Sequence, residues 1–176
     1  MSLFGPRPGR TYLAGAPMLV AHRGGSRLAP ENTMAAFRAA VETWEADMLE
    51  MDVHLTRDGE VVVIHDDTVD RTTDGVGPVS SFTFAELRRL DAGYRFVDPE
   101  GRPSFRAQGV EVPRFEEVLT AFPRVRMNVE AKETAVAAPM VDIVRRHRAE
   151  SRVLVAAEHE RCRAPARGYG GPWGAS

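Results

Sequence analysis

The sequence predicts an α/β fold built on parallel strands, and two observations support this prediction. Short apolar runs alternate along the 176 residues with segments whose apolar positions recur at helical spacing. A strand, helix, strand, helix order produces parallel βαβ units with right-handed crossovers. The composition agrees with one globular domain, because 43% of the residues are hydrophobic and 27% are charged.

The first half of the chain alternates between buried strands and one amphipathic helix. The helix has either Asn32 or Thr33 available as its N-cap. The residues Arg57-Asp58-Gly59 indicate a tight turn between two strand-like segments. The elements expected here are strands at 18–21, 48–55 and 61–64, and a helix at 33–45.

The second half begins with a polar, Gly- and Pro-rich stretch over residues 67–106, which we interpret as a small insertion after the third strand. The capping-box pattern Thr83-Phe84-Ala85-Glu86 predicts one short helix inside it. Regular alternation then resumes, and the chain is expected to hold five or six strands in all. The remaining elements are helices at 114–122 and 135–147, strands at 126–130 and 153–156, and a sixth strand near 173–176.

Several classes of protein are disfavoured by composition. The formal net charge of −2 argues against a general nucleic-acid binder. Cys162 is the only cysteine, which excludes an intrachain disulfide and a multi-cysteine zinc site. The longest apolar runs fall far short of the roughly 20 residues that a membrane span needs. Residues 1–17 have no apolar block, so we expect a flexible leader and a cytoplasmic location rather than a secretory signal.

Acidic side chains recur on two of the predicted strands. Glu50 and Asp52 stand two residues apart and therefore project from one face, and Glu130 and Lys132 repeat this spacing. Neighbouring carboxylates repel one another unless a cation lies between them, and a hard divalent ion prefers such oxygen ligands. The alternatives are a solvated strand face for the first pair and a surface Glu–Lys pair for the second.

Two histidines follow predicted strands at the edge where parallel sheets build their sites. His22 and His65 each stand at the C-terminal end of a strand. Imidazole titrates near neutral pH, so two of them facing one substrate can serve as acid and base. Arg23 follows the first histidine directly, and its planar guanidinium suits a phosphate. A lone histidine at a strand end is more often structural.

Seven short segments follow one another along the chain: HRG at 22–24, PENT at 30–33, EMDV at 50–53, TRDG at 56–59, VIHD at 63–66, RTT at 71–73 and NVEAK at 128–132. Their order and spacing resemble the glycerophosphodiester phosphodiesterase family over about residues 18–156. No single tripeptide carries the resemblance, whereas the ordered set is specific.

The resemblance implies a TIM (β/α)8 barrel that hydrolyses glycerophosphodiesters to glycerol 3-phosphate and an alcohol. It implies one Mg²⁺ or Ca²⁺ site, general acid–base catalysis by two histidines, and an insertion after the strand that bears the second histidine. The residues it assigns are His22 and His65 as acid and base, Glu50, Asp52 and Glu130 as metal ligands, Arg23 and Lys132 as phosphate contacts, and Glu31 and Asn32 as shapers of the first loop, with Asn32 nearer the site.

The length sets a further expectation. A complete barrel of this kind has about 250 residues, so residues 18–176 are expected to form the N-terminal part of one, with two unpaired sheet edges that could support oligomers. An alternative is a catalytically inactive fragment that binds metal or a partner. A second alternative is a related barrel that cleaves choline-bearing phospholipids in the manner of sphingomyelinase D, which the lack of disulfides disfavours.

Overall fold

The computed structural model describes residues 12–15, 17–157, 162, 164–166 and 168–175. A six-stranded sheet forms its centre, with β1, β2, β4, β5 and β6 parallel and in that order, and β3 antiparallel beside β2. The strands are β1 (Val20–Ala21), β2 (Met48–Leu55), β3 (Val61–Val63), β4 (Arg126–Ala131), β5 (Val153–Ala157) and β6 (Trp173–Ala175). The helices are α1 (Met34–Glu42), α2 (Phe84–Leu87), α3 (Phe115–Ala121) and α4 (Thr134–Arg146), with 3-10 turns η1 (His22–Gly24) and η2 (Val79–Ser81).

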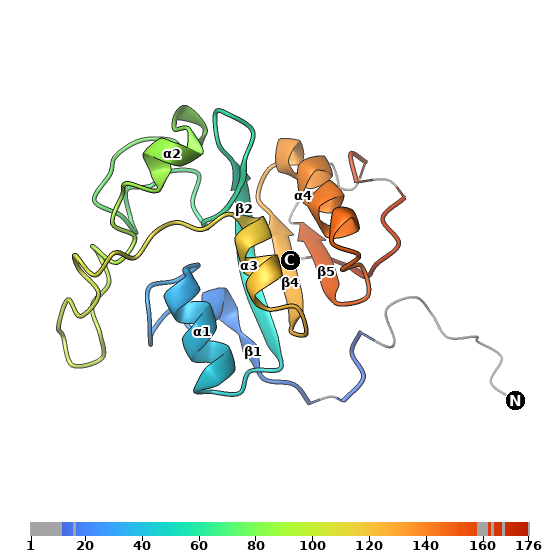
Figure 1. Ribbon diagram of the computed structural model, residues 1–176, viewed down its shortest axis with the longest axis horizontal. Helices are drawn as coiled ribbons and strands as arrows, with labels where there is room; N and C mark the ends of the chain where they lie inside the picture. The colour runs from blue at the N-terminus through green and yellow to red at the C-terminus, as the bar shows by residue number, and fades with distance from the viewer. Residues whose placement is uncertain (1–11, 16, 158–161, 163, 167, 176) are drawn as a thin grey trace, which may run out of the picture.

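The two faces of β2 differ because strand side chains alternate. Leu49, Met51 and Val53 are fully buried in the main apolar core, which also takes in side chains of α1, α3 and α4. These three helices lie on one side of the sheet (Figure 1). Glu50 and Asp52 project from the opposite face, so the alternation places apolar groups under the helices and acidic groups on the other side.

The sheet does not close on itself, and β1 and β6 stand at the two ends of its order. The predicted incomplete (β/α)8 barrel with five to six strands is therefore confirmed. The sixth strand expected near residue 173 is β6, which pairs with β5 in parallel. Among the described residues, no helix is long and apolar enough to cross a membrane.

β2 and β3 form a hairpin, which agrees with the tight turn predicted at Arg57-Asp58-Gly59. β3 runs antiparallel to β2, with Val53 opposite Val63, so His65 follows an antiparallel strand. The connection between the two strands is a short turn in which Gly59 adopts a left-handed φ of 82°. A turn this short can only form a hairpin, because a parallel crossover needs a dozen or more residues.

Residues 67–106 form a separate lobe after β3, on the side of the sheet away from α4 and β5 (Figure 1). Its helix α2 begins with the predicted capping box, in which the Thr83 hydroxyl accepts from the Glu86 backbone and the Glu86 carboxylate accepts from the Thr83 backbone. A second, smaller apolar cluster stabilises the lobe against the hairpin. Its buried members are Val62, Ile64, Val69, Val79, Phe84, Leu87, Ala92 and Val112.

The expected leader, residues 1–17, lies largely outside the described residues. Tyr12, which is described, is buried, and its hydroxyl donates a hydrogen bond to the backbone oxygen of Met127 at 2.7 Å. This contact holds residue 12 against the start of β4.

Thr33 is the N-cap of α1 and sets the position of the first loop. Its buried hydroxyl accepts from the Ala36 backbone at 3.3 Å and donates to the Pro30 carbonyl at 2.7 Å. We predict that Thr33→Ala lowers the free energy of unfolding by about 1–2 kcal/mol, since the cap and a buried hydrogen bond are both lost. Urea titration followed by circular dichroism measures this.

The matched control is Thr43→Ala at the exposed C-terminal end of the same helix. It is expected to change stability by less than about 0.5 kcal/mol. Equal effects of the two substitutions would contradict the capping role of Thr33.

Candidate active site

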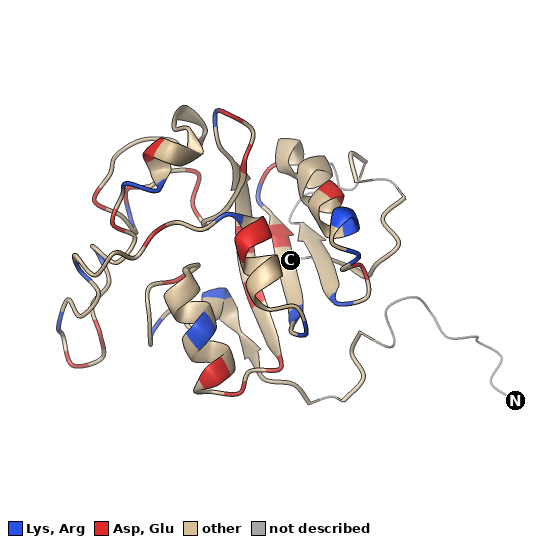
Figure 2. Ribbon diagram, viewed as in Figure 1, with Lys and Arg blue, Asp and Glu red and all other residues tan. Residues whose placement is uncertain are grey.

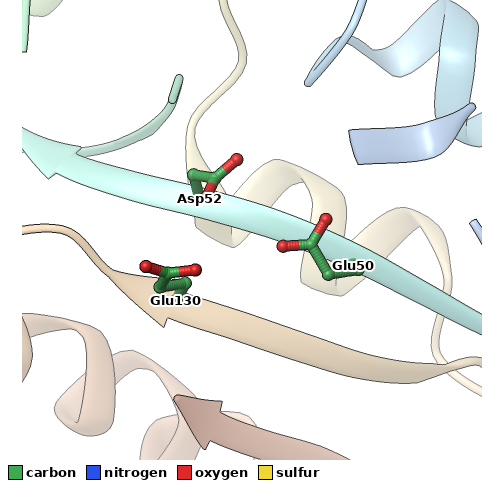
Figure 3. Close-up of side chains that lie close together, drawn as sticks. All are labelled: Glu50, Asp52 and Glu130. Carbon is green, nitrogen blue, oxygen red and sulfur yellow. The ribbon is translucent and has the colours of Figure 1, made fainter. Parts of the chain in front are cut away.

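Three carboxylates from two neighbouring strands form the centre of the site. β2 and β4 are paired in parallel with Asp52 opposite Glu130, and Glu50 lies two residues earlier on the same face of β2. Figure 3 shows the three side chains on the same side of the sheet. One oxygen from each lies within 4.8 Å of the others. The interpretation of Glu50 and Asp52 as a solvated strand face is wrong, because Asp52 is only 1% exposed.

The cluster carries strong electrostatic strain. Burial, followed by the nearby charge of Asp52, raises the pKa of Glu50 to about 7, and Glu130 adds to this effect. A backbone hydrogen bond from Arg23 to Glu50, 2.7 Å long, works in the opposite direction. Acidic residues lie within β2 and β4, at the centre of the sheet (Figure 2). Three convergent carboxylate oxygens fit a hard divalent cation, which would relieve this repulsion.

The loop after β1 supplies the guanidinium of Arg23, whose backbone adopts an uncommon left-handed conformation. Arg23 has a left-handed φ of 51°, and its guanidinium Nε lies 3.5 Å from Asp52 Oδ2. Gly24 follows with φ of 77°, and a Cβ there would stand 2.8 Å from the Cβ of Ala36 on α1. Only glycine fits this close approach. The glycine therefore lets the loop lie against α1 while Arg23 reaches the acidic cluster.

Asn32 lies where the resemblance predicted, next to the cluster. Its amide Nδ2 donates to Asp52 Oδ2 at 2.9 Å, and the residue is 3% exposed. The N-cap of α1 is Thr33, which leaves Asn32 available for this contact. Glu31 lies beside Arg23, with its Oε1 atom 3.1 Å from Arg23 Nη1.

The two histidines approach the cluster from the ends of different strands. His22 follows β1, and its Nε2 lies 4.0 Å from Glu50 Oε2, with the side chain 67% exposed. His65 follows β3, and the hairpin returns it to the level of Asp52, since the Ile64 backbone donates to the Asp52 carbonyl at 3.0 Å. The edge that both histidines share is thus the predicted one, although the hairpin and not a parallel strand brings His65 there.

Lys132 connects His65 to the carboxylates. Its Nζ lies 3.0 Å from Glu130 Oε1, 3.7 Å from Asp52 Oδ1 and 3.4 Å from His65 Nε2. The interpretation of Glu130 and Lys132 as a surface pair is wrong, because both side chains are largely buried beside the cluster. The amine thus offsets part of the negative charge there.

Two charged side chains that the sequence reasoning gave no role also contact the site. Asp66 Oδ1 lies 2.6 Å from His65 Nδ1, and Arg71 donates hydrogen bonds to both Asp66 and Glu31. The signal for Asp66 is its position directly after His65. Another neighbour, His54, contacts the His65 backbone oxygen through Nε2 at 3.0 Å.

Comparison with known proteins gives one consistent family. Residues 22–161 match the model of the glycerophosphoryl diester phosphodiesterase family. A glycerophosphodiester phosphodiesterase of Caldanaerobacter subterraneus subsp. tengcongensis is 40% identical over 145 residues, which cover 78% of this chain and 56% of that protein. The chain spans about half the length of the curated relatives it matches.

Solved structures agree with these matches. A glycerophosphodiester phosphodiesterase from Agrobacterium tumefaciens superposes with a TM-score of 0.77 at 35% identity, covering 86% of this chain and 62% of the other. A phosphodiesterase from Oleispira antarctica, solved in complex with the product sn-glycerol-3-phosphate, superposes with a TM-score of 0.75 at 27% identity, covering 90% and 64%.

The raised pKa of Glu50 predicts a pH-dependent effect of its neutral analogue. The folded metal-free protein binds the Glu50 proton more tightly than the unfolded chain, with pKa values of about 7 and 4.5. Stability from this group is therefore present at low pH and lost as the pH rises through 7. We predict that Glu50→Gln resembles the wild type below pH 4.5 but unfolds at a higher temperature than the wild type at about pH 8.

Thermal unfolding in the presence of EDTA at the two pH values measures this difference. Glu42→Gln, on the exposed surface of α1, is the control, and its unfolding temperature is expected to match that of the wild type at both pH values. A Glu50→Gln variant that is less stable than the wild type at the higher pH would contradict the account.

Proposed function

Since this chain belongs to the glycerophosphoryl diester phosphodiesterase family, we propose that it hydrolyses glycerophosphodiesters to glycerol 3-phosphate and an alcohol. The observation that carries the proposal is the convergence of three carboxylates, two imidazoles and two cations at one edge of the sheet. The solved relative with bound sn-glycerol-3-phosphate supports the choice of product.

The acidic cluster is the proposed site of Mg²⁺ or Ca²⁺. Glu50, Asp52 and Glu130 would hold the ion, and their hard oxygen donors suit either metal. When bound, a divalent ion polarises a phosphoryl oxygen and stabilises charge that develops there. The proposal therefore includes both Mg²⁺ and Ca²⁺ as candidate ions.

His22 and His65 are the proposed acid and base. One imidazole would take the proton of the attacking hydroxyl, which belongs either to water or to the neighbouring carbon of the glycerol. A new P–O bond then forms, the bond to the alcohol oxygen breaks, and the other imidazole protonates the departing alkoxide. Attack by water gives glycerol 3-phosphate directly, whereas attack by the glycerol hydroxyl gives a cyclic phosphate, whose ring a second attack by water must open. Their separate approaches, one beside Glu50 and one beside Lys132, support a division of these two tasks.

Arg23 and Lys132 are the proposed contacts to the phosphate. Both cations lie within 4 Å of the carboxylate cluster, so an anionic diester could share them with the acids. Their charge would offset the negative charge of the transition state. Asn32 and Glu31 would hold the first loop in place through their contacts to Asp52 and Arg23.

One observation favours the alternative of an inactive metal-binding chain. The β1 edge exposes apolar side chains, among them Leu19, Leu28 and Trp44, around an open groove of about 360 Å³. His22 also lines this groove, so water would reach this proposed acid–base residue from the β1 edge, which weakens electrostatic stabilisation. Metal binding without turnover would support this alternative.

The assembly of oligomers through the open sheet edges and a cytoplasmic location of the protein stay predictions.

The metal requirement predicts a simple dependence on chelation. Release of glycerol 3-phosphate from a glycerophosphodiester is expected to fall to background in EDTA and to return with excess Mg²⁺ or Ca²⁺, because the carboxylates need an ion to offset their repulsion. An enzyme-coupled assay for glycerol 3-phosphate measures this. Activity that resists the chelator would contradict the metal assignment.

The acid–base roles predict large losses on substitution. His22→Ala and His65→Ala are each expected to lower kcat by about 10²–10⁴-fold, because proton transfer is lost on one side of the reaction. The control is His147→Ala, which removes an imidazole paired with Glu116 on the surface at 2.7 Å. Full activity in either site variant would rule out a catalytic role for that histidine.

A further inference from the structure

The carboxylate of Asp66 fixes which nitrogen of His65 carries the proton. His65 Nδ1 lies 2.6 Å from Asp66 Oδ1. A strong hydrogen bond from Arg71, assisted by the contact to His65, lowers the pKa of Asp66 to about 2. The carboxylate is therefore ionised and can only accept, so the Nδ1 atom of His65 must donate.

The opposite nitrogen of the same ring has the complementary character. His65 Nε2 lies 3.4 Å from the ammonium of Lys132, and an ammonium group can only donate. Nε2 is therefore the acceptor nitrogen of the neutral ring. It is also the nitrogen that faces the carboxylate cluster, because Lys132 Nζ lies 3.0 Å from Glu130.

Arg71 holds the carboxylate of Asp66 in place. Its Nε and Nη2 donate to the two oxygens of Asp66 at 2.6 and 3.0 Å. Its Nη1 and Nη2 donate to the two oxygens of Glu31 at 3.0 and 2.7 Å. One planar guanidinium thus serves two carboxylates, a geometry that lysine cannot reproduce. It joins the loop after β3 to the loop after β1.

We propose that Asp66 is a positioning residue that keeps neutral His65 in the Nδ1–H tautomer, and that Arg71 clamps Asp66 to Glu31 so that Nε2 of His65 is presented to the substrate. The inference rests on the proposed function, in which the Nε2 atom of His65 accepts a proton during the reaction. The order of contacts is Glu31, Arg71, Asp66, His65, Lys132.

The decisive variant is Asp66→Asn, which keeps the shape of the side chain and changes one acceptor into a donor. The remaining carbonyl oxygen is expected to stay with Arg71 Nε, which makes the shorter of the two contacts to this carboxylate. The amide then faces His65 Nδ1 and donates to it, which favours the Nε2–H tautomer. In that form the nitrogen facing the site no longer accepts a proton.

Nitrogen-15 NMR of the histidine-labelled chain reads the tautomer directly, and loss of a signal in His65→Gln assigns the resonance. The wild type is expected to show Nδ1–H, and Asp66→Asn a shift toward Nε2–H. The same variant is expected to lower kcat by about 10²-fold with KM nearly unchanged. The control is Asp67→Asn, which alters the exposed neighbouring carboxylate and is expected to change neither reading.

The outcomes separate this inference from the proposed function. A wild-type His65 in the Nε2–H form, or a tautomer unaffected by Asp66→Asn, overturns the inference, as does a changed tautomer with unchanged kcat. A wild type that hydrolyses no glycerophosphodiester overturns the proposed function, while the tautomer reading still decides the role of Asp66.

A second variant covers the case in which Asp66→Asn does not fold. Arg71→Gln leaves Asp66 in place and removes the clamp, so His65 is expected to stay in the Nδ1–H form while kcat falls about tenfold through lost alignment. Unchanged kcat in Arg71→Gln would overturn the clamp.

Discussion

The repulsion among three buried carboxylates is the constraint around which the site is arranged. Glu50, Asp52 and Glu130 share one face of two paired strands, with their oxygens within 4.8 Å of one another. Burying like charges this closely is unfavourable unless positive groups or a cation offset them. Burial raises the pKa of Glu50 to about 7, and the neighbouring charges of Asp52 and Glu130 add to this effect. The groups that surround the cluster all act to reduce the repulsion.

The surrounding groups come from three different parts of the chain. The first loop supplies Arg23 and Asn32, the end of β4 supplies Lys132, and the β2–β3 hairpin supplies His65. Arg23, Asn32 and Lys132 contact Asp52, and His65 contacts Lys132. These loops are therefore held in place by the same charged groups that would bind a substrate. Arg71 adds the connection between the hairpin and the first loop. The positions of these loops and the proposed function therefore depend on the same contacts.

Local periodicity explains which features could be predicted from the sequence. The bounds of β2 and the shared face of Glu50 and Asp52 follow from the two-residue repeat of a strand, and the cap of α2 follows from residues three apart. The hairpin of β2 and β3 follows from the tight-turn residues between them. The contact between Arg71 and Glu31 joins residues 40 apart in the chain and depends on how the lobe packs, which no local pattern encodes. The motif resemblance supplied the predictions of a metal site and of acid–base roles, which periodicity alone left open.

Calorimetric titration of a divalent ion into the metal-free chain tests the central claim most directly. At about pH 6, below the pKa of Glu50 at about 7, binding of one Mg²⁺ or Ca²⁺ per chain is expected to release close to one proton, and Glu130→Gln is expected to weaken the binding strongly. The proton count comes from repeating the titration in buffers of different ionisation enthalpy. Absence of binding, or binding that releases no proton and is unaffected by Glu130→Gln, would contradict the account.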